Sequence, residues 1–240
     1  MTRSETQDPD IAGQLEAAAT AQERFQIMYT VLRDRISMLD YPPGTQLSEE
    51  VLAGEFGISR SPLRKALQIL EADGLVLSQQ GVGTLVTDVD LDELAQVYQL
   101  RMELNELTGS LSPTLADDSL KTLFASMRLR AERLRATPDR QAFARLNIDF
   151  FHAFQLLTEN QPLRDVSEKL FYRTCRIWLT LIPDRDLAAE VAIFSDEILA
   201  IADAVTVGDV GAAAHIRRAH LSMGFKRLTE MQQAEGAQAG

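Results

Sequence analysis

The sequence predicts a mainly α-helical protein in two parts, and three observations support this fold class. Apolar residues recur at helical spacing along most of the 240 residues, glycine-flanked β-prone runs lie near residues 75–87, and no β-α-β alternation is present. We expect three helices and a β-hairpin over residues 21–88, then an all-helical antiparallel bundle over residues 89–232. The polar residues 1–20 and 233–240 are expected to form flexible tails.

The composition is that of a globular protein. Hydrophobic residues make up 45% of the chain and charged residues 25%, which excludes a disordered or collagen-like chain. No apolar run approaches the ~18 residues needed to span a bilayer, and the N-terminus lacks the apolar segment of a secretory signal. The lone Cys175 cannot form an internal disulfide. These features predict a cytoplasmic protein that has no membrane partner.

The first part contains three helical patterns and one hairpin pattern. The first helix covers residues 25–39 and stops before the turn-forming run YPPG. The second helix begins after Ser48, a good N-cap, and ends at Gly57. The third helix runs from Ser59 to Gly74. The runs LVLS and TLVT on either side of QQGVG then predict a β-hairpin.

Helix, glycine-containing turn, helix and hairpin is the order of a winged helix-turn-helix. The exposed face of its third helix carries Arg60, Arg64 and Lys65, and no acid occurs between Ser59 and Leu70. The whole chain has a net charge of −11, so this local basic excess stands out. It suits contact with DNA phosphates and guanine edges. A small helical domain with a solvated basic face is the alternative interpretation.

Residues 91–231 divide into six amphipathic segments of ~20 residues each, a length that suits an antiparallel helical bundle. The breaks between them fall at Pro113, Pro138, Asn160-Gln161-Pro162, Pro183-Asp184 and Gly208-Asp209. This part contains no glycine-rich phosphate loop. Residues 88–92 are expected to link it to the first part.

The run PPGTQLSEEVLAGEFGISRSPLRKALQILEADGLV resembles the N-terminal domain of GntR-family bacterial transcriptional regulators. The resemblance covers residues 24–88, and the segment SRSPLRKAL is highly specific. It implies DNA contacts from Ser59, Arg60, Ser61, Arg64, Lys65, Gln80 and Gly81. The wing tip departs from the family pattern, because Gln79 and Gln80 precede Gly81 where the family often has a basic residue.

The second part resembles the FCD effector domain of the FadR branch of that family. The runs VYQLRMELNEL, FARLNIDFF and GDVGAAAHIRRAHL resemble three of its helices. The resemblance implies a helical bundle around a small-molecule pocket, which in many members holds a divalent metal on an Asp or Asn and three histidines. Arg101 takes a position at which an arginine often meets the acidic group of the effector. The alternative is a salt bridge from Arg101 to Glu103 or Glu106 nearby, or to an acidic residue across the bundle.

The residues at the family's metal-ligand positions do not favour a metal ion. Asn147 takes the acid or amide position, Phe151 and Ile198 take two histidine positions, and only His220 matches a histidine. Phenylalanine and isoleucine donate no lone pair, so we expect neither a bound metal nor another cofactor. We expect the effector to bind through Arg101, Asn147 and His220 against Phe151 and Ile198.

Asp149 and His152 offer a second candidate pair, because their i, i+3 spacing occurs in the metal sites of helical bundles. The apolar stripe of their helix runs from Phe143 to Leu157. On a helical wheel, His152 lies roughly opposite the centre of this stripe, and Asp149 lies well off it. We therefore expect both outside the pocket, and we expect His215 to be exposed to solvent as well.

Together these features predict a ligand-responsive regulator and not an enzyme. It is expected to bind double-stranded operator DNA as a homodimer and to act as a repressor modulated by a small, acidic organic effector. One alternative is a helical metal-dependent enzyme with an accessory DNA-binding-like domain, but no nucleophile–base arrangement is evident. The other is an architectural DNA-binding protein without an effector, which the polar Arg101, Asn147 and His220 disfavour.

Overall fold

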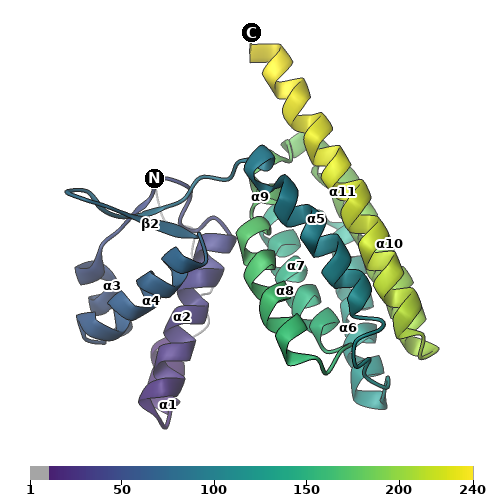
Figure 1. The fold of residues 1–240 in the computed structure, drawn as a ribbon, viewed down its shortest axis with the longest axis horizontal. Helices are drawn as coiled ribbons and strands as arrows, with labels where there is room; N and C mark the ends of the chain where they lie inside the picture. Colours follow the sequence, from purple (N-terminus) through teal and green to yellow (C-terminus); the bar gives the residue numbers. More distant parts are fainter. Residues whose placement is uncertain (1–10, 240) are drawn as a thin grey trace. The chain divides into compact units, whose positions relative to one another are not determined.

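Four helices and three short strands form the first part of the chain in the computed structural model, which describes residues 11–239. They are α1 (Ile11–Ala17), α2 (Ala21–Ser37), β1 (Gln46–Leu47), α3 (Glu49–Phe56), α4 (Arg60–Ala72), β2 (Val76–Gln79) and β3 (Gly83–Val86). The succession of α3, turn, α4 and hairpin is that of a winged helix-turn-helix, as the sequence predicts (Figure 1). The pattern of residue contacts divides the chain into two units, with the boundary between Asp88 and Val89.

The turn between α3 and α4 is set by two residues that the sequence marks as caps. The Ser48 side chain accepts a hydrogen bond from the backbone N–H of Val51, which satisfies a free donor at the start of α3. Gly57 ends α3 at a φ of 63°, in the left-handed region where a side chain causes strain. Helix α4 then begins at Arg60 and buries its predicted apolar stripe.

A three-stranded antiparallel sheet in the order β1-β3-β2 completes this unit. Strands β2 and β3 form the predicted hairpin, with Gln79 opposite Gly83. The sequence does not predict β1, because two residues are too few to show an alternating pattern. β1 pairs with β3, and the Gln46 side chain donates a hydrogen bond to the Val82 carbonyl at the hairpin turn.

The structure differs from the predicted tails at both ends. Residues 11–17 form α1, which packs against α2 and α3 and buries Leu15. At the other end, α11 remains helical through residues 233–239, since alanine and glutamine are good helix formers. Residues 1–10 and Gly240, also predicted as tail, lie outside the described residues.

Seven α-helices and one 3-10 turn form the second unit within residues 89–239. They are α5 (Leu91–Leu107), α6 (Asp118–Ala136), α7 (Arg140–Gln155), α8 (Gln161–Thr174), α9 (Ile177–Leu181), the turn Asp184–Asp186, α10 (Leu187–Thr206) and α11 (Val210–Ala239). The five predicted breaks are present, and α9 is an additional short helix. Cys175 and Arg176 separate α8 from α9, and both are buried. Neither is a turn-forming residue type, so the sequence does not mark this break.

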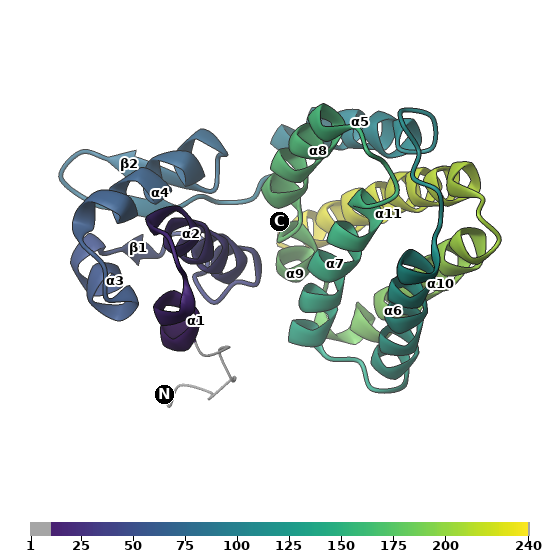
Figure 2. The ribbon, with the colours of Figure 1, turned by 90° about the horizontal axis from the view of Figure 1, so that it is seen from below.

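The helices of the second unit surround a largely aromatic and aliphatic core. α5 lies along α11, and α10 packs against both α6 and α11 (Figure 1). α7 lies between α6 and α8 (Figure 2). Across residues 11–239, no helix combines the length and hydropathy that a bilayer crossing requires.

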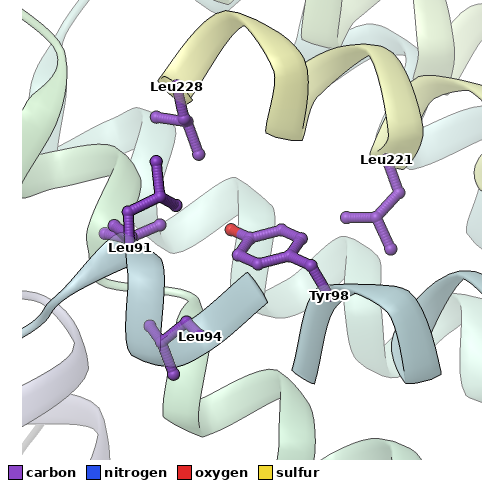
Figure 3. Close-up of a cluster of buried hydrophobic side chains, with 6 residues drawn as sticks. Leu91, Leu94, Tyr98, Leu221 and Leu228 are labelled. Atoms are coloured by element: carbon purple, nitrogen blue, oxygen red, sulfur yellow. The ribbon is translucent and has the colours of Figure 1, made fainter. Parts of the chain in front are cut away.

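One buried cluster joins the start of α5 to α9 and α11. It consists of Leu91, Leu94, Tyr98, Ile177, Leu221 and Leu228 (Figure 3). The Tyr98 ring also packs against Phe225, with ring centroids 4.7 Å apart. Because α5 begins directly after the link to the first unit, this cluster ties the first residues of the bundle to its last helix.

The contact between the end of α5 and the start of α11 depends on Gly109. A Cβ at this position would lie 2.9 Å from the Cα of Gly211 and 3.0 Å from the Cβ of Ala214. We therefore expect Gly109→Ala to lower the free energy of unfolding by about 1–3 kcal/mol, the usual cost of overpacking. Urea denaturation followed by circular dichroism measures this change.

Gly211→Ala is the matched control for this prediction. Its added Cβ would meet only the Asp209 carboxylate, at 3.4 Å, which is an ordinary contact. We expect this variant to be as stable as the wild type or slightly more stable. Equal stability of the two variants would show that the two helices do not depend on this close approach.

Candidate functional site

All seven residues that were predicted to contact DNA are exposed on the first unit. They are Ser59, Arg60, Ser61, Arg64, Lys65, Gln80 and Gly81. Ser59 is the N-cap of α4, yet its hydroxyl makes no capping hydrogen bond. The first turn of α4 also contains no acidic side chain. The positive end of the helix dipole and the Ser59 hydroxyl therefore remain available for a phosphate group.

The arginines of α4 are held by acidic side chains of α3. Arg64 donates from Nε to Oε2 of Glu49 at 2.8 Å, and Arg60 lies 3.2 Å from Glu50. Lys65 points elsewhere, with its ammonium 5.1 Å from the centroid of the Phe25 ring. Glu49 and Glu50 lie in the first turn of α3, where acidic side chains favour the start of a helix. The structure shows that they also orient the basic face of α4.

The hairpin turn forms a wing with an amide-rich tip. Gly81 and Gly83 have φ values of 79° and 115°, which glycine adopts without strain. Gln79 and Gln80 are both exposed beside them. The tip can therefore offer hydrogen-bond donors to a DNA backbone, but its residues 79–83 carry no positive charge.

The second unit encloses a small cavity of about 50 Å³ between its helices. Three of the five predicted effector residues line it: Arg101 of α5, Asn147 of α7 and His220 of α11. The remaining lining comes mainly from α10 and α11, with Trp178 from α9. The cavity therefore lies where side chains from six helices, α5 and α7 to α11, converge.

Two ion pairs account for both carboxylates that line the cavity. Arg217 donates from Nη1 to Glu197 at 2.6 Å, and both side chains are nearly inaccessible, at 6% and 7% exposure. Arg227 donates two hydrogen bonds to Glu190, at 2.8 and 3.0 Å. Such fork-shaped pairs have fixed geometry. Each glutamate is therefore neutralised by an arginine of the facing helix.

Arg101 is the third cation of the cavity, and no carboxylate in residues 11–239 lies within ion-pair distance of it. Its Nη1 donates to the Thr174 hydroxyl at 2.5 Å, and its guanidinium carbon lies 5.4 Å from the rings of Tyr98 and Phe171. Burial lowers the pKa of Arg101 to about 10, so the group is still charged at pH 7. Burial also raises the pKa of Tyr98 to about 12, which keeps its hydroxyl neutral.

The alternative partners considered for Arg101 are engaged elsewhere. Glu103 and Glu106 both lie next to Arg218, at 3.0 and 2.7 Å. The position of Arg101 therefore leaves an uncompensated positive charge inside the bundle. Burying such a charge is costly unless a counter-ion joins it.

Asn147 and His220 add two more polar side chains to the lining of the cavity. Both side chains are partly buried and line the cavity. Within the described part of the chain, neither makes a side-chain hydrogen bond or ion pair. An amide and an imidazole can each donate and accept hydrogen bonds.

The structure does not bring Phe151 and Ile198 to this cavity, which corrects their predicted placement. Phe151 is buried and stacks on Phe171, with centroids 3.9 Å apart, so Phe171 covers it on the cavity side. Ile198 is fully buried in α10, and its neighbour Glu197 faces the cavity instead. A rotation of one residue along α10 accounts for the position of Ile198. Phe151 lies one turn beyond Asn147 on the same side of α7 and is separated from the cavity by Phe171.

Asp149 and His152 lie outside the cavity, as the helical wheel predicts. They line an open groove of about 480 Å³ on the outer face of α7. Asp149 pairs with Arg130 at 2.5 Å, and His152 is hydrogen-bonded to the Tyr172 hydroxyl at 2.9 Å. His215 is exposed, and its Nδ1 lies 2.8 Å from a backbone carbonyl. Among the described residues, no group of three or more His, Cys, Asp or Glu is placed to hold a metal ion.

The sequence analysis missed the ion-paired residues of the cavity and Trp178. A signal for the glutamates was present, because Glu190 and Glu197 are seven residues apart and therefore lie on the same face of their helix. Arg217 precedes His220 by three residues and shares its face of α11. No sequence signal identifies Trp178, since α9 itself is not predicted.

Two protein families account for most of the chain. Residues 26–86 match the family described as "Bacterial regulatory proteins, gntR family", and residues 96–223 match the "FCD domain". The two matched segments correspond to the winged helix-turn-helix and to the helical bundle with its cavity.

Curated relatives of this chain carry the names of regulators. It is 29% identical over 153 residues to the HTH-type transcriptional regulator YdhC of Bacillus subtilis, covering 62% of this chain and 68% of YdhC. It is 27% identical over 214 residues to an HTH-type transcriptional regulator of Streptomyces ambofaciens, covering 82% of each. The gluconate operon transcriptional repressor of Bacillus subtilis is 37% identical over 73 residues, which is 30% of each chain.

Solved structures share the fold. McbR/YncC of E. coli superimposes with a TM-score of 0.74 at 17% identity, over 87% of this chain and 98% of McbR/YncC. A GntR regulator from Rhodococcus sp. RHA1 gives a TM-score of 0.69 at 21% identity, over 86% of this chain and 98% of that one. The chain therefore belongs to the GntR family, as a DNA-binding transcriptional regulator with an FCD effector-binding domain.

Proposed function

We propose that this regulator senses a small organic acid, whose carboxylate binds Arg101 in the cavity of the second unit. The observation that carries the proposal is the buried, uncompensated charge of Arg101. Both glutamates of the cavity are already paired with Arg217 and Arg227. A carboxylate ligand supplies the missing negative charge, and a guanidinium binds it with two parallel hydrogen bonds.

Asn147 and His220 complete the proposed site. Their free amide and imidazole line the same cavity as Arg101. They can hydrogen-bond a second oxygen or a hydroxyl of the ligand and so distinguish one acid from another. In this proposal, Arg101 supplies the charge that binds the acid, and Asn147 and His220 supply selectivity. These roles explain why α5, α7 and α11 each contribute a polar side chain to the cavity.

The residues of the cavity do not fit a divalent metal ion, which many FCD domains hold. One imidazole and one amide are a poor ligand set for a transition metal. The two carboxylates are engaged by arginines, and the charge of Arg101 repels a second cation. We therefore propose that Arg101 supplies the positive charge to which the acid binds.

On the DNA side, we propose that Glu49 orients Arg64 for base recognition. Glu49 engages the Nε of Arg64, which leaves both terminal nitrogens free. Two terminal nitrogens match the O6 and N7 acceptors of guanine in the major groove. Ser59, Arg60, Ser61, Lys65 and the wing residues Gln80 and Gly81 then contact the backbone phosphates.

The proposal includes a homodimer that places two α4 helices in successive major grooves of a near-palindromic operator, where it acts as a repressor. As a protein that binds chromosomal DNA, it acts in the cytoplasm. Effector binding acts on the DNA-binding unit through α5, because Arg101 lies on the helix that directly follows the link between the units. Occupancy of the cavity can thus bias the position of α5.

Arg64→Ala is expected to weaken binding to a DNA site that the protein has selected from a random library. The expected loss is about 1–3 kcal/mol, the usual value of an arginine that pairs with a base edge. Fluorescence anisotropy at fixed salt measures it. Arg135→Ala, which removes an exposed ion pair with Asp196 on the second unit, is the control and is expected to bind as the wild type does. Equal affinities of all three proteins would exclude Arg64 from the interface.

Arg101→Met is expected to abolish the response to acids and to stabilise the protein. Replacing an uncompensated buried charge with an apolar side chain of similar shape is often stabilising. We expect a Tm increase of about 2–4 °C, which corresponds to about 1 kcal/mol in a chain of this length. Differential scanning calorimetry measures the Tm, and anisotropy measures DNA affinity with and without a panel of small carboxylates.

The matched control for this prediction is Arg128→Met, which removes a partly exposed arginine paired with Asp203 outside the cavity. Without acid, both variants are expected to bind DNA as the wild type does. The acid response is expected to persist only in the control. A response that survives in Arg101→Met would contradict the proposed role of Arg101.

A further inference from the structure

The cavity beside Arg101 is smaller than the sites that usually bind organic molecules. Its volume is about 50 Å³, whereas such pockets typically measure about 300–1,000 Å³. A space of this size holds only a few water molecules. One wall of the cavity must therefore move before any acid but the smallest can reach Arg101.

Most of the wall is fixed by contacts between long helices. The ion pairs of Glu190 and Glu197 join α10 to α11. Phe143 of α7 packs edge-to-face against Phe194 of α10, with centroids 5.3 Å apart. Buried ion pairs and packed aromatic rings are costly to separate. These parts of the wall are poor candidates for movement.

Trp178 differs, because a short element supplies this large side chain. α9 spans only Ile177–Leu181, and its N-terminus has no side-chain cap. A helix of this length has little stability of its own. Arg140 of α7 holds its far end through the carbonyl oxygens of Leu179 and Ile182, at 2.9 and 2.8 Å. At the end that carries Trp178, Ile177 and Arg176 are buried, whereas the Trp178 side chain is only partly buried.

The indole of Trp178 rests on the backbone of α11. A Cβ at Gly224 would lie 2.9 Å from Cζ2 and 3.1 Å from Cη2 of the ring, so the position has room only for glycine. The guanidinium carbon of Arg227 lies 5.9 Å from the indole centroid, within cation–π range. On its other side, the indole packs against the cluster shown in Figure 3. These contacts hold the ring against the cavity.

We propose that Trp178 is the movable wall of the cavity and sets the upper size limit of the acids that bind at Arg101. This inference rests on the proposed function of the cavity. An acid small enough to fit beneath the indole binds without displacing it. A larger acid must first separate the ring from Gly224 and Arg227, and the loss of these contacts lowers its affinity.

Calorimetric titration of the full-length chain with acetate, benzoate and naphthoate tests the proposal. The wild type is expected to prefer acetate. Trp178→Ala is expected to bind the two aromatic acids at least about tenfold more tightly than the wild type does, the scale on which pocket size discriminates ligands. Trp178→Leu, a milder change, is expected to give an intermediate preference and guards against misfolding of the alanine variant.

Phe225→Ala is the matched control. Phe225 packs against the same cluster as Trp178 but does not line the cavity. Its removal deletes similar aromatic bulk, yet the size preference is expected to stay that of the wild type. Trp178 is the only tryptophan of the chain, so its fluorescence in the wild type is expected to change on binding of benzoate and to change less with acetate.

Three results would overturn the proposal. An unchanged size preference in Trp178→Ala and Trp178→Leu would exclude Trp178 as the limiting wall. Benzoate binding to the wild type without a change in fluorescence would do the same. In both cases, loss of acid binding in Arg101→Met would leave the proposed function standing. If no acid binds to the wild type or to either Trp178 variant, the proposed function fails together with this inference.

Discussion

The buried charge of Arg101 is the constraint around which the second unit is organised. The bundle supplies a hydroxyl and two aromatic faces to this guanidinium, but no carboxylate within the described residues. The two glutamates that could neutralise it are held by Arg217 and Arg227. In the proposed function, this cost in stability keeps one positive charge available to a ligand, as is common at functional sites.

The DNA-binding unit uses charge in a different way. Its basic residues are exposed, where screening makes each ion pair weak. The pairs between α3 and α4 therefore contribute less to stability than to the direction in which Arg60 and Arg64 point. In a chain with a net charge of −11, such local placement matters more than the overall balance. Under the proposed function, the same side-chain type binds a ligand where it is buried and DNA where it is exposed.

Local signals in the sequence were sufficient to predict the elements that position both sites. Ser48 and Gly57 determine where α3 begins and ends, and the resemblance to the FCD domain led us to expect Arg101, Asn147 and His220 in the pocket of the bundle. β1, α1 and α9 were not predicted, because short elements depend on contacts with distant residues. The pairing of Glu197 with Arg217 also joins separate helices. Ile198 shows that a shift of one residue on a helix decides which side chain faces a cavity. Phe151 lies on the expected side of α7, but Phe171 of α8 separates it from the cavity.

The central claim is that a carboxylate binds at Arg101. A crystal structure of the protein with an acid that changes its DNA affinity tests this claim most directly. We predict electron density for the carboxylate within hydrogen-bonding distance of the Arg101 guanidinium, with Asn147 and His220 beside the ligand. An acid bound instead in the outer groove of α7, or a metal ion held by His220 and Asn147 with Arg101 unengaged, would contradict it.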